Sequence, residues 1–503
     1  MKTKGMSQQI EALRRMNGRD FYALFMEQGT GKTWTLLADA ERLYGAGTID
    51  AVLVLAPKGV HTNWTRREIP EHLEVPNVVG AWRSGMGKKE RAKLDELLRP
   101  RAAGEVAPLR VLAMNYDALA TKDGFEFASR FLRATRALLA LDESSRVKNP
   151  DSLRTKRVMQ LRRLARVARI ATGTPITNAP LDAFSQMEFL EHGLLGTSSY
   201  RAFVSEFADV VPADHPMILR LAERNPKAAR AQIVARNPDG SPRYRNLDKL
   251  QRLLQPHSYR VLKRDCLDLP EKIYKQVFFD LTPKQRAVYQ TLEDDLRVEL
   301  DDGSIEVVTA LGALVKLQQV TSGHVNIERE PLLIANGDNP RMDALLEVVE
   351  DIDGKFIVWG RFREELRQIA ALLRENGIET VEYHGGVSTK DREVAVDSFQ
   401  RGTARAFVGQ PQSGGIGLTL TAAENVVYYS NDFNLETRLQ SEDRAHRIGT
   451  RRNVIYTDIV ATATIDEPIA RALQRKQSVA AAILGDRVLD LRGKIAENSV
   501  SQA

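Results

Sequence analysis

The chain has 503 residues, 43% of them hydrophobic and 27% charged, so it is long enough for two or three domains with sizeable cores. Its single cysteine, Cys266, excludes an intramolecular disulfide and a zinc site built from cysteines, and it suits a reducing cytoplasm. The first residues lack the apolar stretch of a signal peptide, and no apolar run approaches the roughly 20 residues of a membrane span. We therefore expect a cytoplasmic protein.

The net charge of +6 suits a polyanionic partner such as nucleic acid. The positive charge is concentrated in two segments. Residues 154–169 carry seven Lys/Arg and no acid, and residues 220–245 carry seven Lys/Arg against two acids. Apolar residues recur at helical spacing from Val158 to Ala168, so we predict that residues 154–169 form a helix whose arginines face solvent.

Short apolar runs alternate with longer helical patterns in the first part of the chain. The stretch Thr33–Tyr44 predicts a helix. The runs that predict strands are Phe21–Phe25, Ala51–Ala56, Leu109–Met114 and Ala137–Leu141. This alternation is typical of a parallel sheet covered by helices on both faces.

The same alternation returns late in the chain. Helices are predicted at Glu364–Asn376 and Lys390–Gln400. The runs that predict strands here are Phe356–Trp359, Thr380–Tyr383, Ala406–Val408, Val426–Tyr429 and Val454–Ile459. The sequence therefore predicts an α/β protein with two lobes.

The middle of the chain, about residues 181–335, is mostly helical in character, and Leu269-Pro270-Glu271-Lys272 is the predicted crossing between the lobes. The expected domains are 1–268, with a helical insertion at about 181–268, and 269–503, with a helical protrusion at about 281–335 and one or two helices in the tail 466–503.

The stretch Glu27-Gln28-Gly29-Thr30-Gly31-Lys32-Thr33 follows a predicted strand and opens a predicted helix. Glycines let backbone N–H groups turn towards phosphate oxygens, and the helix N-terminus adds its positive dipole. Lys32 can reach the β and γ phosphates, and the Thr33 hydroxyl can ligate Mg²⁺. The full pattern has a glycine at position 26, where this chain has Met26. Taken alone, the stretch also fits a glycine-rich turn with a solvated lysine.

A second element, the acidic pair Asp142-Glu143, directly follows the apolar run Ala137–Leu141. Asp142 can bind Mg²⁺ directly or through water, and Glu143 can orient and polarise an attacking water. A strand that ends in a solvated acidic turn is the simpler alternative. The preceding Gly-Lys-Thr loop, in an α/β pattern, favours the catalytic interpretation.

Further elements surround these two in chain order. They are Gln9, Leu55-Ala-Pro-Lys58 with Asn63-Trp64, Asn115-Tyr116, Asp142-Glu143 with Lys148-Asn149, Thr172-Gly-Thr174-Pro175, Lys355–Trp359, Tyr383-His384-Gly385-Gly386, Ser413-Gly414-Gly415, and Gln440-Ser-Glu-Asp-Arg444-Ala-His446-Arg447. Together they resemble the motifs of superfamily II helicases, and among these the Swi/Snf-type DNA translocases. The resemblance covers nearly the whole chain. Ser145 and Thr450 depart from it, because relatives usually have histidine and glutamine there.

This resemblance implies two RecA-like parallel-sheet lobes with helical insertions between them, and ATP with Mg²⁺ as cofactors. It implies that Arg444 and Arg447 complete the ATP site from the second lobe; three apart, they are expected to share a helix face. The implied catalytic residues are Lys32, Asp142, Glu143, Arg444 and Arg447, and the implied metal ligands are Thr33 and Asp142. The implied nucleotide-binding residues are Gln9, which would read adenine, with Gln28, Gly29, Thr30, Gly31, Lys32, Thr33, Gly415 and Gln440.

A translocase needs contacts to phosphates more than to bases. The resemblance places Lys58, Asn115, Thr174, Gly385, Ser413 and Gly414 along the DNA, and the second basic segment adds Arg236, Arg243 and Arg245 as candidates. Double-stranded DNA is the expected partner, with branched or single-stranded DNA as further candidates. Trp34, Trp64 and Trp359 have strand-like or helix-like neighbours, so we predict core packing rather than base stacking.

The predicted function is an ATP-driven motor on duplex DNA. A strand-separating or branch-migrating helicase remains open within the same class, and an ATP-gated DNA-binding module with little turnover remains open in another. The compact chain resembles enzymes of bacteria or phage-infected cells.

Overall fold

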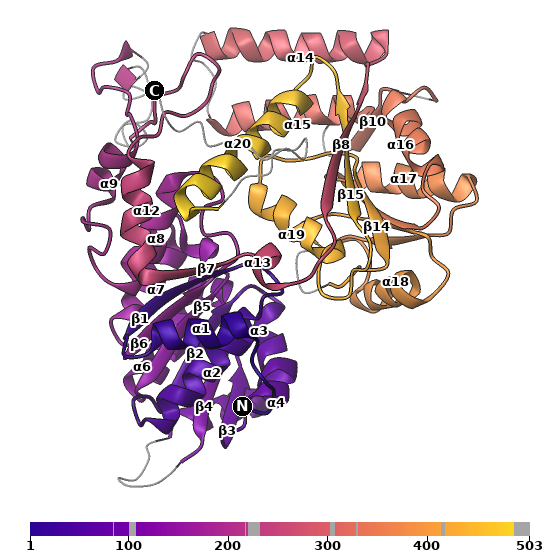
Figure 1. Ribbon diagram of the computed structural model, residues 1–503. Helices are drawn as coiled ribbons and strands as arrows, with labels where there is room; N and C mark the ends of the chain where they lie inside the picture. Colours follow the sequence, from indigo (N-terminus) through magenta and orange to yellow (C-terminus); the bar gives the residue numbers. More distant parts are fainter. Residues whose placement is uncertain are drawn as a thin grey trace. The chain divides into compact units, whose positions relative to one another are not determined.

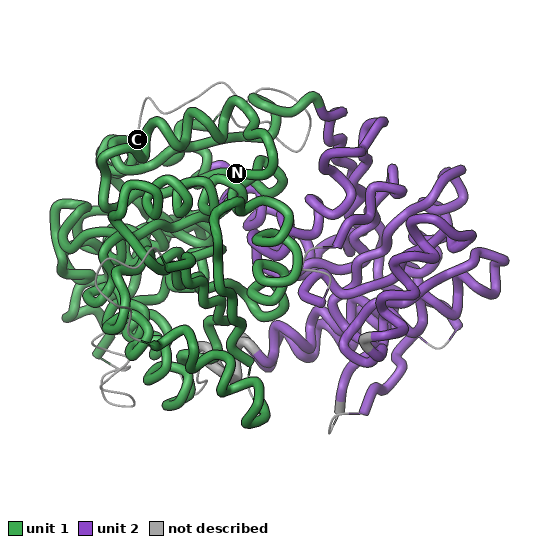
Figure 2. Tube along the Cα trace, turned by 90° about the horizontal axis from the view of Figure 1, so that it is seen from below, with its two compact units in different colours: residues 1–268, 479–486 green, residues 269–478, 487–503 purple. Residues whose placement is uncertain are grey.

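The computed structural model describes residues 1–83, 85–99, 107–216, 218–219, 232–301, 307–327, 330–335, 337–413 and 418–486. Its chain divides into two compact units (Figure 2). The first consists of Met1–Asp268 together with Val479–Asp486, and the second contains Leu269–Ser478. In the part of the chain that is described, no helix has the length and apolar character to cross a membrane.

The first unit is built on a seven-stranded parallel sheet (Figure 1) in the order β3-β4-β2-β5-β6-β1-β7. The central strands are near-continuous apolar runs because helices cover both of their faces. The strands are β1 Phe21–Met26, β2 Ala51–Ala56, β3 Asn77–Ala81, β4 Leu109–Asn115, β5 Ala137–Asp142, β6 Val167–Ala171 and β7 Ser258–Val261.

Two hydrophobic clusters, one on each face, hold this sheet between its helices. Leu24, Val52 and Val54 face one side and Phe25, Leu53 and Leu55 the other, as the two-residue period of a strand requires. The first side is covered by α1 Ser7–Met16, α2 Lys32–Gly45, and a segment made of α3 Val60–Asn63, the π-helical turn η1 Trp64–Glu68 and α4 Ile69–His72. The second side is covered by α6 Lys122–Arg133, α7 Leu153–Arg162, α8 Ala183–Leu190, α9 Tyr200–Phe207 and α12 Leu247–Leu254. The remaining short elements are α5 Lys88–Asp95, η2 Glu96–Leu98, η3 Tyr116–Ala120, η4 Ser144–Val147, η5 Pro180–Asp182, η6 Gln255–His257 and α13 Lys263–Cys266.

The prediction of one helix over residues 154–169 is wrong. Helix α7 ends at Arg162, and β6 pairs with both β1 and β5 inside the sheet. The sequence does not indicate this strand because Arg169 lies within it, and a charged residue is not expected in a buried strand. It is tolerated because Arg169 Nε donates to Asp39 Oδ2 at 2.9 Å, and both side chains are 0% exposed.

The second unit is built on a six-stranded parallel sheet in the order β12-β13-β11-β14-β15-β8. Helices α16 Pro340–Glu350 and α17 Arg363–Glu375 pack on one face, and α18 Thr389–Arg401 and α19 Leu435–Ala445 pack on the other. The strands are β8 Lys272–Phe279, β11 Lys355–Trp359, β12 Thr380–Tyr383, β13 Ala406–Gly409, β14 Ala423–Tyr428 and β15 Val454–Ala461. The other elements are α14 Pro283–Asp301, α15 Val307–Thr321, the hairpin β9 His324–Ile327 with β10 Glu330–Leu333, and α20 Asp466–Leu484, which belongs to the second unit as far as Ser478 and to the first from Val479.

These two sheets confirm the predicted fold class of two parallel-sheet α/β lobes. All nine strands expected from apolar runs are present, but the apolar runs did not reveal β3, β6, β7 and β8. Strands β7 and β8 lie in the section expected to be mostly helical, and each is an edge strand that extends one of the sheets. Edge strands are short or carry polar side chains, so they lack the apolar run of a central strand.

Candidate functional site

A tight loop, residues 27–31, joins the carboxyl end of β1 to the start of α2. Gly29 and Gly31 have φ values of 89° and 95°, which residues with a side chain rarely adopt. Gly31 is the residue before α2, so the first-turn N–H groups of that helix are directed to the loop. Met26 replaces the expected glycine without cost because it is the last residue of β1, and the turn begins after it.

Lys32 and Glu143 approach each other at the carboxyl edge of the sheet. The ammonium of Lys32 donates to the carbonyl of Met26 at 3.0 Å and lies 3.9 Å from Glu143 Oε1. The other oxygen of Glu143, Oε2, accepts a hydrogen bond from the Thr172 hydroxyl at 3.1 Å. Glu143 has a φ of 54°, the left-handed region, which places its side chain out of line with β5. Such local strain, of about 1–3 kcal/mol, is concentrated at functional sites.

Asp142 is the last residue of β5 and is only 5% exposed. Its Oδ2 accepts a hydrogen bond from the indole N–H of Trp64 at 3.0 Å, and its carbonyl accepts one from the Tyr116 hydroxyl at 2.9 Å. Burial, followed by the neighbouring charge of Glu143, raises the pKa of the Asp142 carboxyl to about 6, against the opposing hydrogen bond from Trp64. A cation bound at Asp142 would restore its ionised form.

The residues proposed to hold Mg²⁺ offer the hard oxygen donors that this ion prefers. They are the carboxylate of Asp142 and the hydroxyl of Thr33, which is in the first turn of α2. Across the described ranges, no group of three or more His, Cys, Asp or Glu residues could hold a metal by itself. A site with one or two protein oxygens fits Mg²⁺, which keeps its waters and takes phosphate oxygens from a nucleotide.

Gln9, the predicted adenine-reading residue, lies against the phosphate loop. Its amide Nε2 donates to the Gly31 carbonyl at 3.2 Å, and its Oε1 accepts from the Met6 N–H at 2.6 Å. A side chain at position 31 would collide with it, because an added Cβ would lie 1.8 Å from Gln9 Nε2. The Thr30 hydroxyl donates to the Glu27 carbonyl at 2.8 Å, which closes the loop on itself.

Gln186 on α8, which sequence reasoning missed, joins the loops after β5 and β6. It is 0% exposed, and its Oε1 accepts from the Ser144 hydroxyl at 2.7 Å. Its Nε2 donates to the carbonyl of Pro175 at 2.6 Å and to that of Asp182 at 2.9 Å. The only available signal was a polar residue within the apolar helix α8, and this pattern does not identify a partner.

The loop after β6 also contacts the phosphate loop and the end of the Asp-Glu element. A Cβ at Gly173 would lie 3.2 Å from the Glu27 Cα, so the glycine allows the two backbones to approach. The ammonium of Lys148 donates to the Thr177 hydroxyl, which donates to Asp182 Oδ2 at 3.0 Å. Ser145, where relatives usually have histidine, is 2% exposed.

In the second unit, Arg444 and Arg447 do not share a helix face, so that expectation is wrong. Helix α19 ends at Ala445, and Arg447 lies in the turn that follows. Both guanidinium groups nevertheless donate to the carbonyl of Leu418, at 3.5 Å from Arg444 and 3.2 Å from Arg447. Arg447 also donates to the Thr419 hydroxyl at 2.9 Å. The two arginines therefore meet at the segment that follows the Ser413 element.

The end of α19 is closed by local hydrogen bonds. Thr450 accepts from the Arg447 N–H at 3.1 Å and donates to the Ala445 carbonyl at 2.7 Å. Gln440 on α19 donates to Glu436 at 3.2 Å. The predicted residues Gly414 and Gly415 lie outside the described residues.

A buried network of charges holds α19 on the sheet. Arg438 Nε donates to Glu442 Oε1 at 2.9 Å, and its guanidinium pairs with Asp458 on β15. Its guanidinium carbon lies 3.5 Å from the centre of the Tyr428 ring, and Lys272 on β8 pairs with Glu442 at 3.0 Å. Arg438, Glu442 and Asp458 are each less than 9% exposed.

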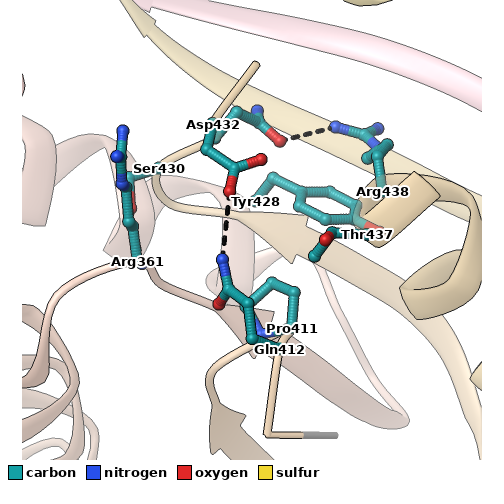
Figure 3. Close-up of a pocket in the computed structure, with 9 residues that line it drawn as sticks. Arg361, Pro411, Gln412, Tyr428, Ser430, Asp432, Thr437 and Arg438 are labelled. Atoms are coloured by element: carbon teal, nitrogen blue, oxygen red, sulfur yellow. Dashed lines mark hydrogen bonds between the residues drawn. The ribbon is translucent and has the colours of Figure 1, made fainter. Parts of the chain in front are cut away.

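A small pocket lies at the carboxyl edge of this sheet (Figure 3). The Gln412 amide crosses it to reach Asp432 at 3.0 Å, and Arg438 reaches Asn431 at 3.0 Å. The residues that line it are Arg361, Pro411, Gln412, Tyr428, Ser430, Asn431, Asp432, Thr437 and Arg438. None of these residues was predicted as a site residue from the sequence.

The residues predicted to contact DNA follow the carboxyl ends of strands. Lys58 is exposed after β2, Thr174 is half-buried after β6, and Asn115 ends β4, where its side chain accepts from the Ala118 N–H at 2.8 Å. In the second unit, Gly385 follows β12 and Ser413 follows β13. Within each sheet these positions share one edge, because all strands are parallel.

Described arginines of both basic segments bind within the first unit. Residues 220–231 of the second segment lie outside the described residues, whereas Arg236, Arg243 and Arg245 are exposed. Arg243 and Arg245 both pair with Asp209, at 3.0 and 3.3 Å. In the first segment several arginines also have partners within the unit: Arg154 with Asp117, Arg157 with the carbonyls of Leu119 and Thr121, Arg162 with the carbonyl of Leu190, Arg166 with Asp20 and Arg169 with Asp39.

Comparison with known proteins places this chain in a family. A family model described as the SNF2-related domain matches residues 11–325, and one described as the helicase conserved C-terminal domain matches residues 340–449. YwqA of Bacillus subtilis (strain 168), which carries the name of an ATP-dependent helicase/translocase, is 26% identical over 487 residues, or 95% of this chain and 47% of YwqA. The chromodomain-helicase-DNA-binding protein 1-like of Mus musculus is 26% identical over 469 residues, or 90% of this chain and 46% of its own.

This chain spans about half the length of these curated relatives. Among solved structures, the Sulfolobus solfataricus SWI2/SNF2 ATPase core in complex with dsDNA is 22% identical to it. That alignment has a TM-score of 0.40 and covers 96% of this chain and 93% of the other.

Proposed function

The chain belongs to the SNF2-related family, and from that premise we propose that it is an ATP hydrolase that is stimulated by DNA and translocates along double-stranded DNA. The observation that carries the hydrolase proposal is the pairing of Lys32 with Glu143, 3.9 Å apart, beside a glycine loop and a helix N-terminus. A lysine that binds phosphate and a carboxylate that polarises water are the two groups that hydrolysis of a phosphoanhydride needs close together.

Each residue has a proposed role. The loop N–H groups and Lys32 bind the phosphates of ATP. Thr33 and Asp142 would hold Mg²⁺, which would neutralise negative charge on the nucleotide phosphates. Glu143, oriented by Thr172, positions the attacking water. Arg444 and Arg447 supply positive charge to the transferred phosphoryl group.

The test replaces the two central groups separately. Lys32→Ala and Glu143→Gln are each expected to reduce steady-state ATP turnover by about 10³-fold or more, by analogy with other sites where charge on the transferred phosphoryl group is stabilised. Binding of duplex DNA should persist in both variants. Lys122→Ala and Glu126→Gln serve as matched controls, because these side chains are 84% and 57% exposed on α6. Retained turnover in either site variant would refute the assignment.

Duplex translocation is the finer part of the proposal, and its support is the family together with exposed basic groups such as Lys58 and Arg236. ATPase rates with duplex, single-stranded and branched DNA and with RNA identify the stimulating polymer. Displacement of a third strand from a triplex without opening of a fork supports translocation. Fork opening would favour a strand-separating or branch-migrating helicase, and DNA binding with negligible turnover would favour an ATP-gated recruitment module.

A further inference from the structure

The indole of Trp64 is the donor that contacts the carboxylate proposed to hold magnesium. We propose that Trp64 is a positioning residue for the metal site: its N–H holds Oδ2 of Asp142 and so fixes the orientation of the carboxylate that would bind Mg²⁺. This proposal rests on the proposed function, because it assigns Trp64 a role in the same ATP site. The contact is 3.0 Å long and fully buried, and it joins residues 78 positions apart.

The backbone around Trp64 is adapted to deliver this contact. Trp64 opens the π-helical turn η1 Trp64–Glu68, between the short helices α3 and α4. π-Helical turns within α-helices are rare and are frequently found at functional sites. Trp64 is 1% exposed and packs in the same hydrophobic cluster as Val54 and Ala56 of β2. The ring is therefore held firmly while its one polar atom faces the acid.

Two other tryptophans, Trp34 and Trp359, do not make such a contact. The indole of Trp34, which follows the phosphate loop, donates to the Thr3 hydroxyl at 3.0 Å, away from the acids. Trp359 is 0% exposed, and its indole nitrogen has no hydrogen-bond partner among the described residues. Burial alone thus does not bring a tryptophan N–H to an acid in this protein.

A donor on one carboxylate oxygen restricts how the group can rotate. Partners that orient metal ligands in this way typically change metal affinity about 10–100-fold when they are removed. Trp64 satisfies the geometric requirement for such a partner.

The experiment measures how nucleotide binding depends on Mg²⁺. Binding of a fluorescent ADP analogue is titrated with MgCl₂ in the wild type, in Trp64→Phe and in the control Trp34→Phe, and it is also measured in EDTA. We expect the half-saturating Mg²⁺ concentration to rise about 10-fold or more in Trp64→Phe and to stay unchanged in Trp34→Phe. Affinity in EDTA should match the wild type, and a high Mg²⁺ concentration should restore ATP turnover. A general loss of structure would not be rescued by Mg²⁺.

A second substitution separates the N–H from the packing of the ring. Incorporation of 3-benzothienylalanine at position 64 keeps the shape of the ring and replaces only the N–H by sulfur, so it decides the question if Trp64→Phe does not fold. The same increase in half-saturating Mg²⁺ supports the proposal. A shift in half-saturating Mg²⁺ concentration below twofold in the benzothienyl protein overturns the proposal for Trp64. If the wild type still binds the nucleotide in a Mg²⁺-dependent way, the proposed function is unaffected. If wild-type nucleotide binding is independent of Mg²⁺, both fail.

Discussion

The two units hold their functional charges in different ways. In the first, Lys32 opens α2 and Glu143 follows β5, and single contacts such as the Lys32–Met26 and Glu143–Thr172 hydrogen bonds hold their charged ends. In the second, Arg444 lies in the last turn of α19, and a buried network around Arg438 holds this helix in place. Lys32 and Glu143 can therefore exchange their hydrogen-bond partners for a ligand, whereas the position of Arg444 depends on the stability of the second unit.

Disruption of the buried network should give the largest effect on stability. Arg438→Met removes the ion-pair partner of Asp458, whereas Glu442 keeps Lys272, and an unpaired buried charge typically costs about 3–5 kcal/mol. Denaturant unfolding, followed by a probe in the second unit, should detect this loss. Arg401→Met is the control, because Arg401 is 84% exposed and its ion pair with Asp397 is on the surface. A loss below about 1 kcal/mol would contradict a structural role for the network.

The matching test in the first unit removes the bridge between its loops. Gln186→Leu leaves the Ser144 hydroxyl and the Pro175 carbonyl unpaired, at a cost of about 1–3 kcal/mol in unfolding free energy. Because Gln186 joins the Asp-Glu element to the loop that carries Thr174, we also expect a smaller stimulation of ATPase activity by DNA. The control is Gln160→Leu, at an exposed position of α7. If Gln186→Leu keeps wild-type stability and wild-type stimulation of ATPase activity by DNA, the bridge is dispensable.

Charge at the surface should affect binding more than stability. Neutralising Arg236, Arg243 and Arg245 to Gln should weaken duplex binding and reduce the slope of log K against log salt by up to about 3, since each phosphate contact contributes about 0.9. Because Arg243 and Arg245 already pair with Asp209, we expect a change in slope smaller than this limit. The control replaces Arg14, Arg67 and Arg252, which are also exposed and paired in the first unit. An unchanged slope would leave the segment as surface charge.

The smallest expected effect is a pH dependence, and it concerns the second unit. His324 is 0% exposed, and burial lowers the pKa of its imidazole despite the opposing charges of Glu365 and Glu364. The folded protein therefore binds this proton more weakly than the unfolded chain does. Stability is retained above the unfolded pKa of about 6.5 and falls as the pH drops below it.

His324→Leu should make unfolding free energy less dependent on pH between 7.5 and 5.5, by less than about 1.4 kcal/mol per pH unit. His192→Leu is the control, because His192 is 78% exposed. Equal pH profiles for the wild type and the His324 variant would exclude this proton as a source of acid instability.

The central strands could be predicted because they are apolar on both faces. Ala51–Ala56 and Ala137–Leu141 are apolar runs typical of a covered sheet; Lys58 lies in the loop after the first run, and Asp142 directly follows the second. The strand β6 could not be predicted, because Arg169 is acceptable there only with Asp39 beside it, and the two are 130 residues apart. The end of α19 before Arg447 was missed as well, since helix termini depend on local capping such as that by Thr450.

The sequence by itself determined the fold class, the family and the order of the motifs, because strand periodicity and loop chemistry are local properties. Only the tertiary structure decided which side chains meet. Trp64 was predicted to be a core residue, and it is one, but its contact with Asp142 depends on a π-helical turn and on the register of β2 beside β5. Gln186 and Arg438 likewise have partners distant in the chain, and hydrogen bonds over such separations leave no periodic signal in a single sequence.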